Sequence, residues 1–269
     1  MIDVALVGAG TMGAHHAGTV GRSQSSRLAV VIDPDLARAE ALAARWGARA
    51  ATAVPRDVDV AIVASPATTH AMVARPLLDR GLALLIEKPL AVDARTAREL
   101  AAGRVWVGFC ERFLDAPSPA AGDRVEIVRT RPPGPRGGDV DVLLDLAQHD
   151  LDHLGRWFGR ALLPSFEGRV ERERVQGTVR LGSASAMATW ARDAATTLRI
   201  HHLGATWIDR HPTPAPPADP LTLQWEAVVD ALSGRPSPKL ATGDDGAWAV
   251  AAAEALRGDA VKHSAPAWV

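Results

Sequence analysis

The sequence predicts an α/β domain built on a parallel sheet, followed by an α+β domain with a mainly antiparallel open sheet. Three observations predict this fold class. Short β-branched runs alternate with stretches of helical period up to about residue 108. After Phe113, several segments alternate polar and apolar residues, which is typical of a sheet with one less buried face. A glycine-rich turn follows the first predicted strand.

The first predicted domain covers residues 1–113. Strands that alternate with helices indicate a parallel sheet with helices on both faces. The predicted strands are 3–8, 27–33, 57–64, 82–87 and 104–109, and the predicted helices are 12–21, 36–46, 70–80 and 92–102.

The second predicted domain covers residues 114–269. Its predicted strands are 123–130, 168–175, 176–182, 185–191 and 197–208. A helix is expected from Asp219-Pro220, as N-cap and first position, to Gly234, and another over 243–257.

One long helix is predicted over 142–158, among the strands of the second domain. Its apolar stripe consists of Leu143, Ala147, Leu151, Leu154 and Phe158. The opposite side holds Asp145, His149, Asp152 and Arg156.

The composition excludes several classes of partner. The formal net charge is −1 and neither half has a basic run, so we expect no nucleic acid or membrane surface and favour a small-molecule partner. No run of eighteen apolar residues occurs, and the first residues contain no basic leader, so we expect neither export nor membrane insertion. The single cysteine, Cys110, fits a reducing compartment, so the expected location is cytoplasmic.

The glycine-rich turn has the spacing of a dinucleotide-binding motif. Gly8, Gly10 and Gly13 follow G-x-G-x-x-G, with Thr11 and Met12 between the last two glycines. Gly8 permits the tight turn, Gly10 lets the backbone approach a pyrophosphate, and Gly13 allows close packing of helix and strand. The first domain is therefore predicted to be a Rossmann-type dinucleotide-binding domain.

Asp33 ends the second predicted strand, where a carboxylate can accept hydrogen bonds from both ribose hydroxyls of an adenosine. The alternative is that Asp33 and Pro34 only cap the next helix. A carboxylate here repels the extra phosphate of NADP, so NAD(H) is favoured as cofactor. Arg38, one turn into the helix, leaves NADP(H) open.

Two further motifs lie at the carboxyl edge of the predicted sheet, where ligands bind in doubly wound folds. Ser65, Pro66 and His70 belong to SPATTH, and Glu87 and Lys88 belong to EKP. The chain has only three lysines against 27 arginines, so a lysine at this edge suggests a function rather than a solvated charge. The alternative for Lys88 is an ion pair with Glu87 or another nearby acid.

The motifs GAGTMGAHH, SPATTH, EKPL, GFCERF and DLAQHDLDHLGRWFG occur in this order and resemble the Gfo/Idh/MocA family, named for glucose-fructose oxidoreductase and inositol dehydrogenase. The resemblance covers both domains. It implies a nicotinamide cofactor on the first domain and substrate beside the sheet of the second. It also implies that Lys88 is catalytic, that the peptide before Pro89 is often cis, and that Asp145 and His149 are the acidic and histidine positions of the site.

The residues themselves support the same chemistry. Asp145 and His149 stand four apart, so on one helix they share a face. A neutral His149 can exchange a proton with an alcohol, and a protonated Lys88 would stabilise the developing alkoxide. The alternative for His149 is a capping or packing histidine. Metal ligation is disfavoured because no glutamate follows a histidine in the metalloprotease pattern.

Two positions after the last strand of the first domain are expected beside the substrate. Cys110 replaces the asparagine that is usual in the resembling motif, and Arg112 follows it. We favour a packing role for the Cys110 thiol over a pocket-lining role. The segment 114–123 is shorter than the helix usual in that family, which leaves the substrate's identity open. His15 and His16 are expected to position the first helix, although His16 fits the family's pattern.

The leading functional prediction is NAD(P)-dependent hydride transfer between nicotinamide C4 and a secondary alcohol or carbonyl of a sugar, cyclitol or related metabolite. The absence of tyrosine disfavours oxidoreductases that use a Tyr hydroxyl as proton donor. One alternative is an imine, enone or tetrapyrrole reductase, for which Trp190 and Trp207 lie on predicted strands. Another is a non-catalytic dinucleotide-binding sensor. An open sheet needs a covering surface, so we expect a homodimer or homotetramer.

Overall fold

The computed structural model describes residues 1–114, 118–119, 124–134, 138–193, 197–202, 205–209 and 219–264. The chain forms two compact units. The first contains Met1–Ala91, Arg95–Leu114 and the described part of Pro214–Gly246. The second contains Val92–Ala94 and the described parts of Asp115–Thr213 and Ala247–Val269. The division of the sequence into domains at residue 113 stays a prediction.

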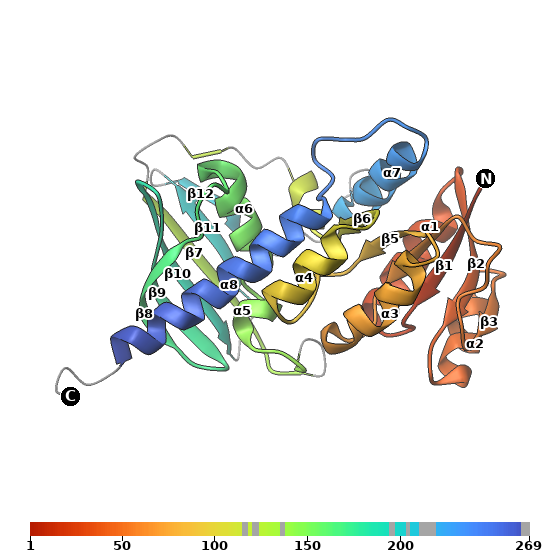
Figure 1. Ribbon diagram of the computed structural model, residues 1–269, viewed down its shortest axis with the longest axis horizontal. Helices are drawn as coiled ribbons and strands as arrows, with labels where there is room; N and C mark the ends of the chain where they lie inside the picture. Colours follow the sequence, from red (N-terminus) through yellow and green to blue (C-terminus); the bar gives the residue numbers. More distant parts are fainter. Residues whose placement is uncertain are drawn as a thin grey trace. The chain divides into compact units, whose positions relative to one another are not determined.

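The first unit contains a six-stranded parallel sheet of order β3-β2-β1-β4-β5-β6 (Figure 1). This order confirms the predicted doubly wound α/β fold. The sequence did not predict β3, because its three residues lack β-branched side chains. The strands are β1 (Ile2–Val7), β2 (Ser26–Ile32), β3 (Arg49–Ala51), β4 (Val60–Val63), β5 (Ala83–Ile86) and β6 (Val105–Val107).

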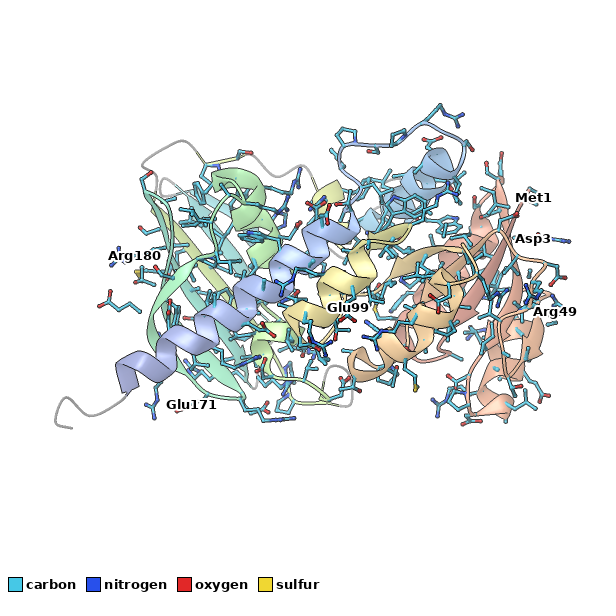
Figure 2. The ribbon with its side chains drawn as sticks, viewed as in Figure 1. Met1, Asp3, Arg49, Glu99, Glu171 and Arg180 are labelled. Carbon is cyan, nitrogen blue, oxygen red and sulfur yellow. The ribbon has the colours of Figure 1, made fainter. Side chains whose placement is uncertain are left out.

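Helices connect these strands, as parallel pairing requires. They are α1 (Thr11–Arg22), α2 (Leu36–Ala44), the 3₁₀ turn η1 (Ala67–Thr69), α3 (His70–Leu78), α4 (Ala94–Ala101) and the 3₁₀ turn η2 (Cys110–Phe113). Glu99 of α4 accepts hydrogen bonds from Arg75 of α3, at 2.7 Å, and from Arg95, at 2.9 Å (Figure 2).

A late segment of the chain, α7 (Pro220–Leu232), also packs in the first unit, against α1 and η2. The Trp225 indole is buried there, and its Nε1 donates to Ser26 Oγ at 2.9 Å. Asp219 caps α7 through Leu221 N at 3.3 Å, and Gly234 has φ +83° just after the helix. The predicted start and end of this helix are therefore confirmed.

The second unit contains a mixed sheet of order β12-β11-β7-β10-β9-β8 (Figure 1). Only β7 and β10 are parallel among the described pairs, so the prediction of a mainly antiparallel sheet is confirmed. The strands are β7 (Arg124–Arg131), β8 (Ser165–Val170), β9 (Arg174–Leu181), β10 (Ala184–Arg192), β11 (Thr197–His202) and β12 (Ala205–Asp209).

Two predicted strands of this sheet were wrong in their limits. The segment 168–175 is not one strand, because a turn after Val170 separates β8 from β9. The segment 197–208 is two antiparallel strands, β11 and β12. The C-terminal helix α8 (Gly243–Ser264) is longer than the predicted 243–257. No helix in the described part of the chain combines the length and apolarity needed to cross a membrane.

The helix predicted over 142–158 is interrupted, so that prediction was wrong. The structure has α5 (Val142–Asp145) and α6 (Gln148–Phe158). The Ala147 N–H reaches back five residues to the Val142 carbonyl at 3.0 Å, and the Gln148 side-chain amide donates to the Leu143 carbonyl at 3.2 Å. In a continuous α-helix the Leu143 carbonyl would accept from the Ala147 N–H, and here the Gln148 side chain donates to it instead.

A buried charge pair joins α6 to the sheet. Asp150 is fully buried and accepts two hydrogen bonds from the Arg129 guanidinium of β7, at 2.8 and 2.7 Å. Trp190 of β10 donates its Nε1 to the same carboxylate at 2.8 Å. Asp150 lies three residues after Ala147 and four before Leu154, so it belongs to the apolar face of α6, where these partners satisfy its carboxylate.

The other face of this sheet is open in the described residues. Along β10, Ala186, Ala188 and Trp190 are buried, whereas Met187, between them, is 61% exposed. Charged side chains occupy the neighbouring strands of this face, and Arg180 donates to Glu167 at 3.2 Å (Figure 2). Exposed pairs of this kind stabilise a fold by at most about 1 kcal/mol.

The buried pair gives a stability prediction. Asp150→Ala should lower the free energy of unfolding by about 3–5 kcal/mol, because Arg129 would remain buried without its carboxylate. Asp3→Ala, which removes the exposed partner of Arg27, is the control and should cost at most about 1 kcal/mol. Urea unfolding followed by circular dichroism measures both. Equal losses in the two variants would contradict the prediction.

Candidate functional site

The turn between β1 and α1 is closed by direct backbone contact. Gly8 has φ +104°, and its N–H donates to the Ile32 carbonyl at 2.7 Å. A Cβ on Gly8 would lie 2.6 Å from the Ala64 carbonyl oxygen, and one on Gly13 would lie 1.9 Å from the Gly8 oxygen. No side chain fits at either position, as the sequence predicted for a tight turn and a close helix start.

Gly10 differs from these two glycines. It is the N-cap of α1, where no side chain caps the helix, and a Cβ built on it would meet nothing within 4 Å. Space therefore remains above the helix start, where the first N–H groups, including those of Thr11 and Met12, point outward. A diphosphate fits this place because the helix terminus also has a partial positive charge.

Asp33 follows β2 and supports the same turn. Its Oδ2 accepts from the Ala9 N–H at 2.8 Å, and its Oδ1 accepts from the Asp35 N–H at 2.9 Å. The helix α2 is capped by Asp35, which accepts from Arg38 N at 3.1 Å. The alternative in which Asp33 itself caps that helix is therefore wrong. Each carboxylate oxygen of Asp33 retains a second lone pair for a ribose hydroxyl.

The charge of Arg38 is shared between two carboxylates. Its Nη2 donates to Asp35 at 3.2 Å, and its Nη1 lies 3.9 Å from Asp33. A phosphate on the adenosine ribose would have to compete with both acids for this guanidinium. The local charges thus favour an unphosphorylated ribose.

The SPATTH segment follows β4 at the same edge of the sheet. Thr69 donates its hydroxyl to the Pro66 carbonyl at 2.7 Å, and its oxygen lies 2.8 Å from Ser65 Oγ, whose hydroxyl can donate to it. These bonds fold η1 back over the strand end. Thr69 was not among the predicted site residues, although its place four residues after Ser65 could have indicated the contact.

Glu87 and Lys88 follow β5, next to β4 in the sheet. Glu87 is 7% exposed, and His16 donates from Nε2 to its Oε1 at 2.7 Å. The Lys88 N–H lies 3.3 Å from Glu87 Oε2, and the Lys88–Pro89 peptide is cis, as the family resemblance implied. His16 was expected only to position its helix, and the structure adds the contact with Glu87.

His70 begins α3 and is 1% exposed. Its ring nitrogens face two carbonyl oxygens, with Nδ1 at 2.8 Å from Pro89 and Nε2 at 3.0 Å from Ser65. His70 therefore joins the loop after β4 to the loop after β5.

Cys110 and Arg112 lie in η2, after β6. Burial, and then the carboxylates of Glu87 and Glu111, raise the pKa of the Cys110 thiol well above its usual range. Arg112 is 4% exposed, and its Nη1 donates to Asp245 at 3.0 Å. Both sets of contacts favour packing roles.

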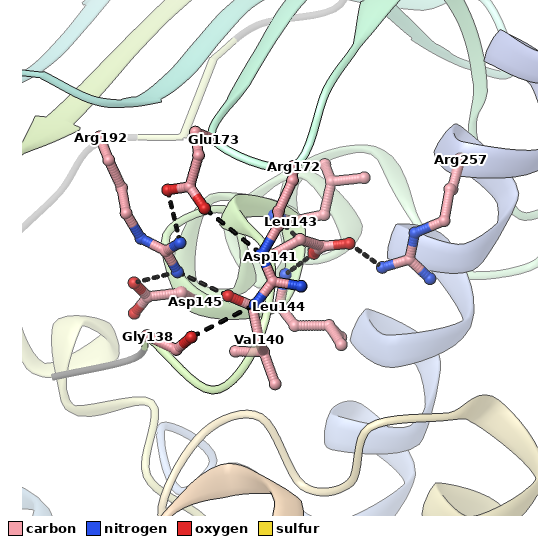
Figure 3. Close-up of polar contacts among 10 residues, drawn as sticks. All are labelled: Gly138, Val140, Asp141, Leu143, Leu144, Asp145, Arg172, Glu173, Arg192 and Arg257. Carbon is pink, nitrogen blue, oxygen red and sulfur yellow. Dashed lines mark hydrogen bonds and ion pairs between the residues drawn. The ribbon is translucent and has the colours of Figure 1, made fainter. Parts of the chain in front are cut away.

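In the second unit, Asp145 belongs to a network of charged side chains (Figure 3). Its carboxylate pairs with Arg131 of β7 and with Arg192 of β10, the latter at 3.4 Å. Arg192 also donates to Glu173 at 2.6 Å and to the Val140 carbonyl at 2.6 Å. Burial lowers the pKa of Arg192, but the bonds to Glu173 and Asp145 outweigh it and raise the pKa overall. Asp145 thus has two fixed cationic partners.

The same network fixes the start of α5. Asp141 caps this short helix through Leu143 N and Leu144 N, at 3.1 and 3.2 Å, and accepts from Arg257 of α8 at 2.5 Å (Figure 3). His149 is half-buried on α6, beyond the interruption that follows Asp145. Among the described residues, no group of three His, Cys, Asp or Glu side chains could hold a metal ion.

Residues 2–103 match the profile of an oxidoreductase family described as having an NAD-binding Rossmann fold, Gfo/Idh/MocA. Residues 2–103 belong to the Gfo/Idh/MocA family. The motifs on which the resemblance rested in the first domain, from the glycine turn to EKPL, all lie within this match.

Curated relatives match about half of the chain. Inositol 2-dehydrogenase 4 from Saccharopolyspora erythraea is 40% identical over 126 residues, which cover 42% of this chain and 37% of the relative. UDP-N-acetylglucosamine 3-dehydrogenase from Acidithiobacillus ferrooxidans is 33% identical over 162 residues, covering 55% and 51%. The matched part of the chain thus spans about 37–51% of the length of these relatives.

Solved structures match the fold over nearly the whole chain. A myo-inositol dehydrogenase from Corynebacterium glutamicum has a TM-score of 0.79 at 20% identity, covering 98% of this chain and 97% of that chain. A UDP-N-acetylglucosamine 3-dehydrogenase structure from A. ferrooxidans has a TM-score of 0.80 at 24% identity, covering 96% and 99%. The chain therefore shares the fold of these two structures over nearly its whole length.

The glycine contacts give a paired prediction. Gly10→Ala should leave the melting temperature nearly unchanged but weaken NADH binding at least about tenfold, because the new methyl group would occupy the space above α1. Gly13→Ala should destabilise the fold, because its Cβ would clash with the Gly8 carbonyl. Thermal melts and NADH fluorescence titrations measure the two effects. Unchanged NADH affinity in Gly10→Ala would refute the assignment of this turn.

The raised pKa of Cys110 predicts a slow reaction with alkylating reagents. A thiol of ordinary pKa, about 8.5, is about one quarter ionised at pH 8, whereas Cys110 should have far less thiolate. We expect iodoacetamide to modify folded protein at least about tenfold more slowly than the urea-unfolded chain. Mass spectrometry measures both rates, and equal rates would contradict a half-buried thiol with a raised pKa.

Proposed function

We propose that the protein is an NAD-dependent dehydrogenase that transfers hydride between nicotinamide C4 and a secondary alcohol or carbonyl of a sugar or cyclitol. The main support is the turn of residues 8–13, where the start of α1 is open above Gly10 and Asp33 stands beside it. The relatives named for inositol and UDP-N-acetylglucosamine dehydrogenation support the substrate class.

The residues of the first unit suit a dinucleotide. We assign the diphosphate to residues 8–13, with Thr11 and Met12 at the helix start, and the adenosine ribose to Asp33. Ser65, Pro66 and Glu87 follow the neighbouring strands at the edge where such ligands bind. Because both acids near Arg38 already share its charge, we propose NAD rather than NADP as the cofactor.

NAD, when bound, supplies the nicotinamide carbon that accepts or returns hydride. In the proposed mechanism, the Lys88 ammonium stabilises negative charge on the substrate oxygen. His149 takes the hydroxyl proton during oxidation and returns it during reduction. The Asp145 carboxylate, paired with Arg131 and Arg192, can accept a hydrogen bond from a substrate hydroxyl or from His149.

The proposed substrate-binding residues are Lys88, Asp145 and His149, with Cys110 and Arg112 after β6. For Cys110 and Arg112, the contacts described above favour packing over direct contact with substrate. The alternative of a reductase for flat, apolar substrates loses part of its support, because Trp190 is fully buried and bonded to Asp150. The side chain of Trp207 lies outside the described residues.

We further propose that the protein is cytoplasmic and assembles into a homodimer or homotetramer. The support for assembly is the open face of the second sheet, where Met187 is 61% exposed. The support for the location is the single cysteine, which cannot form an intramolecular disulfide and so fits a reducing compartment.

The function is tested with a panel of polyols, cyclitols, sugar nucleotides and imines, each with NAD(H) and NADP(H), followed by absorbance of the reduced nicotinamide. We expect turnover with a cyclitol or sugar and NAD(H). His149→Ala should lower kcat by about 10²–10⁴ with NADH affinity retained. Asp244→Ala, at the start of α8, is the control. NADH binding without turnover of any panel member would favour a sensor, and an unchanged kcat would remove His149 from the mechanism.

A further inference from the structure

Lys88 lies between two residues that are each bonded to a buried histidine. Glu87, before it, is bonded to His16 of α1, and Pro89, after it, is bonded to His70 of α3. Both histidines are 1% exposed. All these residues belong to the first unit.

The bond between His16 and Glu87 joins residues that are 71 positions apart. At 2.7 Å it is a short, buried hydrogen bond to a carboxylate, a type that is stronger than a neutral bond. The other ring nitrogen of His16, Nδ1, is buried and has no hydrogen-bond partner among the described residues. His16 therefore bonds Glu87 through Nε2 and makes no second ring bond that would explain its burial.

Glu87 has little space in which to move. A Cβ on Gly108 would lie 3.0 Å from Glu87 Cδ and 3.1 Å from its Cα. Its Oε1 faces His16, and its Oε2 faces the Lys88 N–H at 3.3 Å. A displacement of the carboxylate would therefore be transmitted to the Lys88 backbone.

His70 acts on the other side of Lys88. Its Nδ1 lies 2.8 Å from the Pro89 carbonyl oxygen and its Nε2 lies 3.0 Å from the Ser65 carbonyl oxygen. Carbonyl oxygens only accept hydrogen bonds and a neutral imidazole has one N–H, so a ring with its proton on Nδ1 donates to Pro89 and only packs against the Ser65 carbonyl, whereas a protonated ring donates to both. In either form the ring contacts both the segment after Lys88 and the end of β4.

We propose that His16 and His70 are positioning residues that set the place of Lys88 by holding Glu87 and Pro89. The inference rests on the proposed role of Lys88 in the reaction. Neither histidine needs to touch substrate for this role. A displacement of a reacting group by about 1 Å can lower a rate about 10²-fold, so a small shift of Lys88 on loss of either bond would be enough to slow turnover.

Amide substitutions separate this role from simple packing. The side-chain nitrogen of glutamine stands as many bonds from Cα as Nε2 of histidine, and that of asparagine as many as Nδ1. His16→Gln can therefore keep the bond to Glu87, whereas His16→Asn cannot reach it. At position 70 the order is reversed, because the Pro89 carbonyl faces Nδ1. His70→Asn should keep that bond and His70→Gln should lose it.

The kinetic test compares these variants with His16→Leu and His70→Leu. We expect the leucine variants to lower kcat by between about 10- and 100-fold while the Kd for NADH changes less than about threefold. His16→Gln and His70→Asn should recover most of the loss, and the opposite amides should not. His15→Leu, on the exposed side of α1, is the control. Equal rescue by both amides at either position would overturn the proposal.

A second measurement, by NMR, reports on the surroundings of the Lys88 side chain and does not require turnover. The chain has three lysines, so reductive ¹³C-methylation gives few NMR signals, and Lys88→Arg assigns that of Lys88. We expect this signal to shift in both leucine variants and to return in His16→Gln and His70→Asn, while the Lys239 signal stays constant. If a leucine variant fails to fold, the two amides at that position are compared instead.

The two measurements distinguish the possible failures. A shifted Lys88 signal in a protein without turnover on any substrate would support the positioning role and refute the dehydrogenase. Normal turnover in the wild type with an unmoved Lys88 signal in the variants would refute the positioning role alone.

Discussion

The Asp33 carboxylate holds the turn between β1 and α1 by accepting the Ala9 N–H at 2.8 Å. Around this bond the backbone leaves no room for side chains, because Cβ atoms on Gly8 and Gly13 would meet carbonyl oxygens at 2.6 and 1.9 Å. The helix start is therefore fixed against the sheet, with its N–H groups facing outward. Every later feature of the first unit's site is placed relative to this turn, because β4 lies beside β1 and β5 beside β4 in the same parallel sheet.

The second unit depends on a different kind of constraint. Its helix α6 presents a carboxylate, Asp150, to the interior, where Arg129 and Trp190 satisfy it. Such a pair favours one alignment of helix and sheet, because a shifted helix would leave a buried charge without its partners. Contacts around the interruption after Asp145 favour the same alignment of helix and sheet. Gln148 donates to the Leu143 carbonyl, and Asp145 pairs with Arg131 and Arg192 of the sheet.

Much of the site followed from local sequence. The glycine turn, Asp33, the loops that contain Ser65 and Lys88, and the cap at Asp219 were all predicted, because each depends on spacing within a few residues or on strand order. The prediction of a continuous helix over 142–158 was wrong. The spacing of apolar residues cannot reveal that the side-chain amide of Gln148, rather than a backbone N–H, donates to the Leu143 carbonyl. The spacing of apolar residues also did not predict that Asp150 is buried, because its partners, Arg129 and Trp190, come from two distant strands.

The sequence by itself determined the doubly wound sheet, the dinucleotide motif at its edge and the family of residues 2–103. These depend on short-range periodicity and on glycine conformation, which are written into neighbouring residues. The tertiary structure decided that α7 packs against α1, that His16 bonds Glu87 from 71 positions away, and that His70 joins the two loops. These contacts depend on how whole elements pack, and no local pattern specifies which distant side chain will fill the remaining hydrogen bond.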